Sequence, residues 1–150
     1  MKKVILLVFI SLMLCGCANT KEVMEKIEIS GTCQKEEEAE THGGFLGDGE
    51  TFVKLSCKGV ELSKQWKELP LTDSISEVMN LIQCNSDSCK SAIERYNINT
   101  SNGYYFFRDR HSETVDEYDD TNLNNRSSYN FTLAIYNTDT NIIYYYKMDT

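Results

Sequence analysis

The chain has 150 residues, 41% of them hydrophobic, and a formal net charge of −8. A chain of this length fits a single domain with its own hydrophobic core. An acidic domain repels both nucleic acid and anionic lipid headgroups. We therefore set aside DNA binding, RNA binding and direct headgroup binding.

The N-terminus carries the clearest motif in the chain. Two lysines precede an apolar run over residues 4–14, in which only Ser11 is polar. The run is too short for a membrane span, which needs about 20 apolar residues, but it suits the core of a secretory signal. It ends in Leu14-Cys15-Gly16-Cys17, which resembles a bacterial lipobox: an apolar residue, then a small residue directly before the cut, then a thiol.

We predict that residues 1–16 are a cleaved lipoprotein signal peptide and that Cys17 becomes the lipidated first residue, carrying diacylglycerol and palmitate. Two alternatives are an ordinary cleaved signal with incidental thiols and acylation at Cys15, where bulky Leu14 would stand at the cut. No second apolar run of spanning length follows, so the lipid is expected to anchor the protein on the extracytoplasmic face of the cell membrane. The mature 134 residues (150 − 16) would carry a charge of −10 (13 basic and 23 acidic side chains).

Four cysteines remain in the mature chain, and an even number in an exported domain suggests disulfides. Cys33 and Cys57 are symmetric about residue 45 and would face each other across a hairpin. Cys84 and Cys89 would close a short polar loop. Four reduced thiols are one alternative. A zinc site is another, although the spacing is not CxxC and no histidine is near in sequence.

Residues 17–26 are short and polar and are interpreted as a lipidated tether, followed by a single domain over residues 27–150. Alternating apolar and polar residues predict strands over 27–33 and 51–57. The charged run at 34–40 is either a solvated extension of the first strand or a loop. Together these segments predict a hairpin near the start of the domain.

The second half predicts helices first and strands afterwards. A capping-box pattern and an apolar face predict a helix over about residues 73–83, and a second short helix is expected within 89–96. Three strands are predicted over residues 103–111, 129–136 and 142–148. Alternation places Tyr105 and Phe107 on one face of the first strand and Tyr104 and Phe106 on the other, and it points Phe131, Leu133 and Ile135 of the second strand inward. The expected fold class is α+β: a mainly antiparallel sheet of about five strands with one or two helices packed on one face.

The tract at the end of the third predicted strand is a candidate ligand site. Alternation places Arg108 and Arg110 on one face, where they can hold a carboxylate or phosphate. It places Asp109 and His111 on the other face, where they can share a proton or a metal. The alternative is that both arginines pair with local carboxylates such as those of Glu113 and Asp116.

A glycine-rich segment between the first two strands is a second candidate. It contains His42, four glycines and Asp48. Glycines let a ligand approach the backbone closely, but the segment can equally be an elaborate hairpin turn. It has neither a Walker ending nor a dinucleotide fingerprint, and no cofactor is expected.

The chain has two histidines, and each lies in one of these two candidate segments. We therefore expect the two segments to converge on one site, in which His42 and His111 act as ligands or as base and acid. Asp48 and Asp109 would orient them or complete a metal shell. The metal itself is unknown. A loop rich in acids at residues 116–120 lacks the spacing of a calcium loop.

Four blocks also resemble a recurring group of small Gram-positive proteins, many of them lipoproteins. They are HGGFLGDGETFVKL, then Trp66 with LPL at 69–71, then NGYYFFRDRH, then NFTLAIYNTDTNIIYYYKMDT. The resemblance spans most of residues 41–150. It implies a shared domain and carries over no catalytic residue.

The leading hypothesis is therefore a non-enzymatic lipoprotein that binds an unknown protein or small molecule. An alternative is a metal- or His-assisted hydrolase acting on cell-wall or peptide material. A third is a small-ligand receptor that uses an aromatic face around Tyr104, Phe106, Tyr144 and Tyr146.

Overall fold

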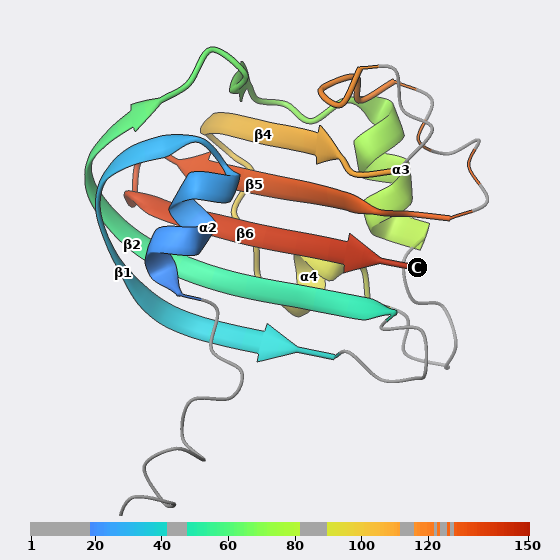
Figure 1. Ribbon diagram of the computed structural model, residues 1–150, viewed down its shortest axis with the longest axis horizontal. Helices are drawn as coiled ribbons and strands as arrows, with labels where there is room; N and C mark the ends of the chain where they lie inside the picture. The colour runs from blue at the N-terminus through green and yellow to red at the C-terminus, as the bar shows by residue number, and fades with distance from the viewer. Residues whose placement is uncertain are drawn as a thin grey trace, which may run out of the picture.

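The computed structural model describes residues 19–41, 48–81, 90–111, 116–121, 123, 126 and 128–150. Within these residues the chain forms one six-stranded sheet and three short helices (Figure 1). The strands are β1 (Ile29–Glu40), β2 (Gly49–Leu62), β3 (Lys67–Glu68), β4 (Gly103–Asp109), β5 (Phe131–Asn137) and β6 (Ile142–Asp149). Their order is β1-β2-β6-β5-β4-β3, and every neighbouring pair is antiparallel.

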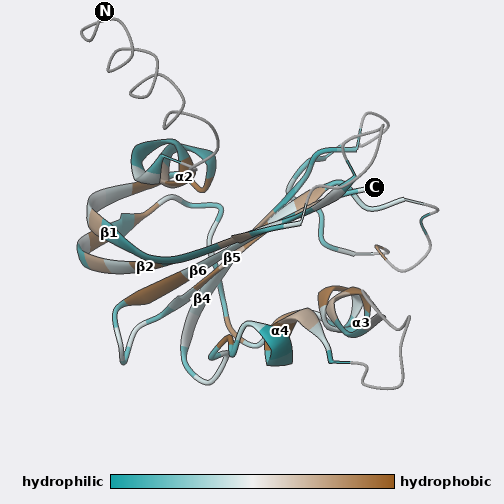
Figure 2. Cartoon of the chain, turned by 90° about the horizontal axis from the view of Figure 1, so that it is seen from below, coloured by the Kyte–Doolittle hydropathy of each residue, from teal (hydrophilic) through white to brown (hydrophobic). Residues whose placement is uncertain are grey.

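This architecture confirms the predicted α+β class and the antiparallel sheet, with two differences. The strand that the sequence analysis did not predict is β3, whose two residues are too few to show a period of two. The helices, moreover, are not confined to one face. Figure 2 shows α2 (Thr20–Lys26) on one side of the sheet, and α3 (Asp73–Leu81) and α4 (Ala92–Arg95) on the other. The central strands are apolar on both faces, so each face requires a cover.

The alternation of the central strands explains the two hydrophobic layers. Tyr105 and Phe107 of β4 pack on the α3/α4 side, and Phe106 between them packs on the α2 side, as the sequence predicts. Strand β5 contributes inward-facing residues to the α3/α4 layer, as predicted, and these are Phe131, Leu133 and Ile135. The same layer receives its helical contribution from Ile75, Val78, Met79 and Ala92.

Helix α2 occupies a segment that the sequence analysis assigned to the tether. Asn19 caps it by accepting a hydrogen bond from the backbone N–H of Lys21, and Val23 and Ile27 are buried against the sheet. Trp66 closes the layer by donating its Nε1–H to the carbonyl of Ile27 at 2.9 Å. Two apolar anchors are enough here because the sheet supplies the rest of the contact. The folded domain therefore includes α2 and does not begin at residue 27.

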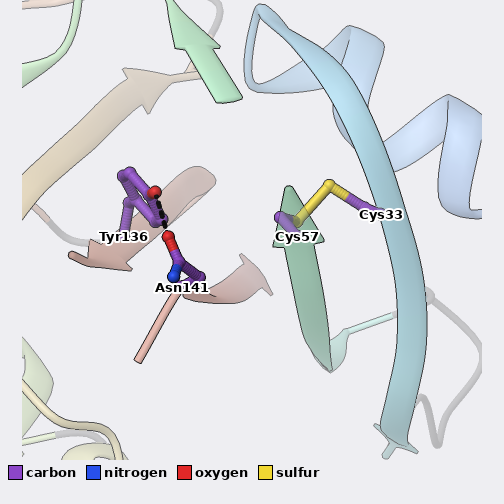
Figure 3. The surroundings of a disulfide bond; sticks show 4 residues. All are labelled: Cys33, Cys57, Tyr136 and Asn141. Carbon is purple, nitrogen blue, oxygen red and sulfur yellow. Dashed lines mark hydrogen bonds between the residues drawn. A yellow bond between two sulfur atoms is a disulfide. The ribbon is translucent and has the colours of Figure 1, made fainter. Parts of the chain in front are cut away.

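The first hairpin is longer than predicted and carries a disulfide. Both strands continue beyond the predicted ends, and the charged run at 34–40 is a strand extension. Cys33 and Cys57 stand opposite each other and are joined by a disulfide (Figure 3), which agrees with the pairing expected from hairpin symmetry. Cys84 and Cys89 lie outside the described residues, so their pairing stays a prediction.

The disulfide is linked to the turn between β5 and β6. The backbone N–H of Cys57 donates to the carbonyl of Asn141 at 2.9 Å. The Asn141 side chain in turn accepts a hydrogen bond from the Tyr136 hydroxyl at 3.0 Å (Figure 3). The clamp between β1 and β2 is thus attached to the middle of the sheet.

Candidate functional site

The α2 side of the sheet carries a recess of about 500 Å³ beside the C-terminal end of the helix. We call it the basic recess. Its lining residues are Lys26, Arg108, Arg110, Glu117, Thr132, Tyr145 and Lys147. A volume of this size is typical of small-ligand sites. Four cations from α2, β4, the residue following β4 and β6 therefore surround one hollow in an otherwise acidic protein.

Strand register explains why these residues meet. Arg108 of β4 stands opposite Thr132 of β5, and Thr132 stands opposite Lys147 of β6. Neighbouring strands are about 4.8 Å apart, so the backbones of the two cations are separated by about 10 Å with the threonine between them. This spacing lets both flexible cationic side chains reach one anionic group placed over Thr132.

The floor of the recess is neutral and buried. Thr132 and Tyr145 are only 3% and 2% exposed. Burial raises the pKa of the Tyr145 hydroxyl. The positive charges of Lys26 and Arg110 and a side-chain hydrogen bond with Thr132 act in the opposite direction. The tyrosine consequently stays protonated at neutral pH, so the floor offers hydroxyl groups and no negative charge.

Carboxylates at the rim hold the four cations in place. Arg108 Nε lies 2.8 Å from Glu117 Oε2, and Arg110 Nη2 lies 2.7 Å from Asp149 Oδ1. Lys147 pairs with the same Asp149, and Lys26 pairs with Glu22 at 2.6 Å. The local balance is four cations against three carboxylates (Glu22, Glu117 and Asp149), whereas the whole chain carries −8.

Asp149 is the central carboxylate of this rim. Its partial burial raises its pKa, but the hydrogen bonds from Lys147 and Arg110 outweigh burial and lower the pKa below its ordinary value. Arg110 is fixed further because its guanidinium donates to the carbonyls of Phe131 and Met148 at 3.1 and 2.8 Å. Arg108, by contrast, has a 38% exposed side chain and a 43% exposed partner in Glu117.

The predicted arginine pair is therefore found on one face, as alternation suggested. Its partners are Glu117 and Asp149, not the carboxylates of Glu113 and Asp116. Glu113 lies outside the described residues, and Asp116 instead accepts a hydrogen bond from the backbone N–H of Tyr118. The pairing of both arginines with carboxylates was one of the two alternatives, and the actual partners could not be chosen without the strand order.

Asp109 and His111 form a different arrangement from the one predicted. Asp109 is 3% exposed, pairs with Arg126 and accepts a hydrogen bond from the backbone N–H of His111 at 2.8 Å. Strand β4 ends at Asp109, so the alternation used for the prediction does not extend to residue 111. The Asp109 carboxylate thus holds the end of the strand and Arg126. No cluster of three or more possible metal-ligating side chains occurs within the described residues.

The expected convergence of the two candidate segments stays a prediction, and the strand register gives only the positions of the strands that flank them. The β1–β2 hairpin and the end of β4 lie at the same end of the sheet, because Gly49 is opposite Asp149, and Phe131 is opposite both Met148 and Asp109. Two strands separate β2 from β4, so their backbones are about 14 Å apart. Asp48, the residue directly before β2, is exposed. His42 lies outside the described residues.

The aromatic face proposed for a small-ligand receptor does not exist as one surface. Tyr104 and Phe106 belong to the α2 layer, whereas Tyr144 and Tyr146 belong to the opposite layer. Three of the four are buried, and these are Phe106, Tyr144 and Tyr146. The prediction took residues from two strands without their mutual register, and that register places the pairs on opposite faces.

A second hollow of about 430 Å³ lies at the opposite end of β4. Its lining is mostly turn residues, namely Glu68, Leu69, Pro70, Thr100, Ser101, Asn102, Gly103, Tyr104 and Thr138. Glu68 is the charged member of this lining, and no set of converging charges is present there. The basic recess is therefore the stronger candidate.

Sequence reasoning missed five members of the basic recess: Lys26, Glu117, Thr132, Tyr145 and Lys147. The alternation of β6 already places Tyr145 and Lys147 on one face, so that pair could have been found. Thr132 required the register between β4 and β5. Lys26 required helix α2, which the tether interpretation excluded.

No family model, curated protein or solved structure matches this chain. The resemblance to small Gram-positive lipoproteins therefore stays a prediction, and the function must be argued from the site itself.

Proposed function

We propose that this protein is a lipid-anchored binding domain on the outer face of the bacterial membrane, and that the basic recess holds an anionic group of its ligand. The anchor is supported by the lipobox that ends at Cys17. No helix in the described part of the chain is both long and apolar enough to span a bilayer. The observation that carries the binding role is the recess, where four cations surround two buried hydroxyl residues.

The recess can exchange its present partners for a ligand at low cost. An exposed ion pair such as Arg108–Glu117 contributes only about 0–1 kcal/mol, so a phosphate or carboxylate can replace Glu117 on the guanidinium. Arginine suits this exchange because its planar fork matches both anions with two hydrogen bonds. Lys147, across Thr132, then supplies a second positive charge. Within the described residues no observation favours the hydrolase alternative.

The anchor is tested by metabolic labelling with a fatty-acid analogue. Cells that produce the wild-type chain should yield a labelled protein, whereas Cys17→Ala should remain unlabelled because the thiol is the acyl acceptor. Cys15→Ala is the matched control and should label like the wild type. Equal labelling of wild type and Cys17→Ala would contradict the anchor.

The recess is tested on the full chain in detergent with dissolved glycerol phosphate as the probe. Backbone NMR signals of Thr132, Tyr145 and Lys147 should shift saturably, and Arg108→Gln combined with Lys147→Gln should weaken binding at least tenfold. Lys90→Gln removes one exposed positive charge beside α4, on the opposite layer, and should leave binding unchanged. Absence of saturable shifts, or equal binding by the double variant, would refute the assignment.

A further inference from the structure

The placement of α2 restricts how the anchored domain can lie on its membrane. Helix α2 begins at Thr20 and is capped by Asn19, only two residues after the predicted lipid attachment at Cys17. Two Cα steps span at most about 7.6 Å. The headgroup layer of a bilayer leaflet is itself about 5–7 Å thick, so the start of α2 must lie at or beside the headgroups.

The basic recess lies on this same side of the molecule. Helix α2 has seven residues from Thr20 to Lys26, which is about 10 Å of helix, and Lys26 lines the recess. The path from the anchor to the rim of the recess is therefore about 18 Å. Helices α3 and α4 lie on the far side of the sheet (Figure 2). Because the link between the anchor and α2 is so short, the membrane faces the α2 side and not these two helices.

We propose that the α2 side docks on the membrane that holds the lipid anchor, and that the basic recess takes the phosphate of an anionic lipid headgroup. This inference rests on the proposed function, because it requires the anchor at Cys17 and an anion site in the recess. Net charge argued against headgroup binding, but that argument averages over the whole surface. The recess is a local site with four cations against three carboxylates.

The charges around the recess suit a headgroup. Lys21 stands on the same helix with an 81% exposed side chain, but it pairs with Glu25, so this pair adds no net charge. Arg108 and Lys147 flank a buried floor of Thr132 and Tyr145, whose hydroxyls hydrogen-bond to each other and carry no charge. The phosphate therefore meets two positive charges over a neutral floor.

Lipid anchoring makes even a weak headgroup contact effective. Once the acyl chains are inserted, the recess meets headgroups at a high effective concentration, and the second contact is intramolecular. An affinity too weak to hold a free domain on a vesicle is enough to fix the orientation of an anchored one. The expected outcome is one preferred face towards the bilayer, with α3 and α4 directed away from it.

The test compares lysine acetylation of the lipidated chain in vesicles of two compositions. In phosphatidylcholine mixed with phosphatidylglycerol, Lys26 and Lys147 should react several-fold more slowly than in phosphatidylcholine alone. Lys90 should react equally in both. In the Arg108→Gln variant the protection of Lys26 should be lost, whereas Lys64→Gln, which removes a positive charge from the β2–β3 turn, should preserve it.

A second measurement keeps the inference testable if a variant is unstable. Protection of Lys26 and Lys147 in wild type should fall as salt is raised, because the Debye length shrinks from about 8 Å at physiological ionic strength to about 3 Å at 1 M. Removing two of the recess cations should weaken the partition of the protein onto anionic vesicles about thirtyfold, because each cation contributes about fivefold.

The outcomes separate this inference from the proposed function. If dissolved glycerol phosphate protects the recess lysines in detergent but anionic vesicles do not, the recess binds a soluble anion and the docking is overturned. Equal protection in both vesicle types, or protection of Lys90 in place of Lys26, would also overturn it. Failure of the protein to float with vesicles would instead remove the anchor itself.

Discussion

Replacing Glu50 with glutamine is expected to lower the free energy of unfolding by about 3–5 kcal/mol, the usual cost of breaking a buried ion pair by removing one partner. Glu50 is 1% exposed and forms a two-pronged pair with the Arg95 guanidinium. Its oxygens also accept hydrogen bonds from the Tyr96 and Tyr146 hydroxyls at 3.0 and 2.6 Å. Glutamine would remove the negative charge that these three donors share.

This cluster attaches α4 to the sheet. Arg95 is the last residue of α4, and Tyr96 stacks on Phe52 of β2 with ring centroids 4.2 Å apart. Burial, reinforced by Glu50, raises the pKa of Tyr96 to about 12. Its hydroxyl is therefore a neutral donor at physiological pH. That contribution to stability is complete below the unfolded-state pKa near 10 and is lost as pH rises through about 12.

Urea unfolding monitored by circular dichroism measures the Glu50 effect. The matched control is Glu25→Gln, because Glu25 pairs with Lys21 at 3.8 Å with both side chains exposed, and such pairs contribute about 0–1 kcal/mol. Glu50→Gln combined with Arg95→Met should recover part of the loss, since both charges of the pair are then removed together. A loss below 1 kcal/mol in Glu50→Gln would show that the pair is not structurally important.

The parts of the fold that were predictable from sequence depend on local patterns. Alternation along β4 and β5 put Tyr105 and Phe107 on a common face and pointed Leu133 inward, because a strand sends successive side chains to opposite faces. Hairpin symmetry placed Cys33 opposite Cys57 for a similar reason: a short connection leaves few registers. Each of these inferences uses neighbours in sequence or one turn.

The candidate site was only partly predictable because it depends on long-range register. Arg108 and Arg110 could be placed on one face from β4 alone, but Lys147 joins them only because β5 lies between β4 and β6. Helix α2 was missed because seven residues with two apolar anchors do not form a clear amphipathic pattern. Its stability comes from the sheet beneath it and from the Trp66 hydrogen bond to Ile27, contacts that no local pattern shows.

Loss of the Cys33–Cys57 disulfide is expected to lower the free energy of unfolding by about 3.5 kcal/mol, from the loop-entropy relation for a bridge that joins residues 24 apart. The bridge restrains the unfolded chain and, in the native state, fastens β1, an edge strand bonded in the sheet only to β2. Much of β1 is charged and half-exposed, so it gains little from burial.

The measurement uses a Cys84→Ala/Cys89→Ala background, in which the Cys33–Cys57 pair is the one disulfide that the domain can form. Oxidised and reduced protein are unfolded in urea, and amide hydrogen exchange follows β1 in each. Reduction should lower the free energy of unfolding by about 3.5 kcal/mol. It should also accelerate amide exchange in β1 before exchange in β5 and β6 changes, because both hydrophobic layers hold β5 and β6 in place. Further replacement of Cys33 and Cys57 with alanine should make stability insensitive to reductant. Equal stability of the oxidised and reduced forms would show that the edge strand is held by its ladder alone.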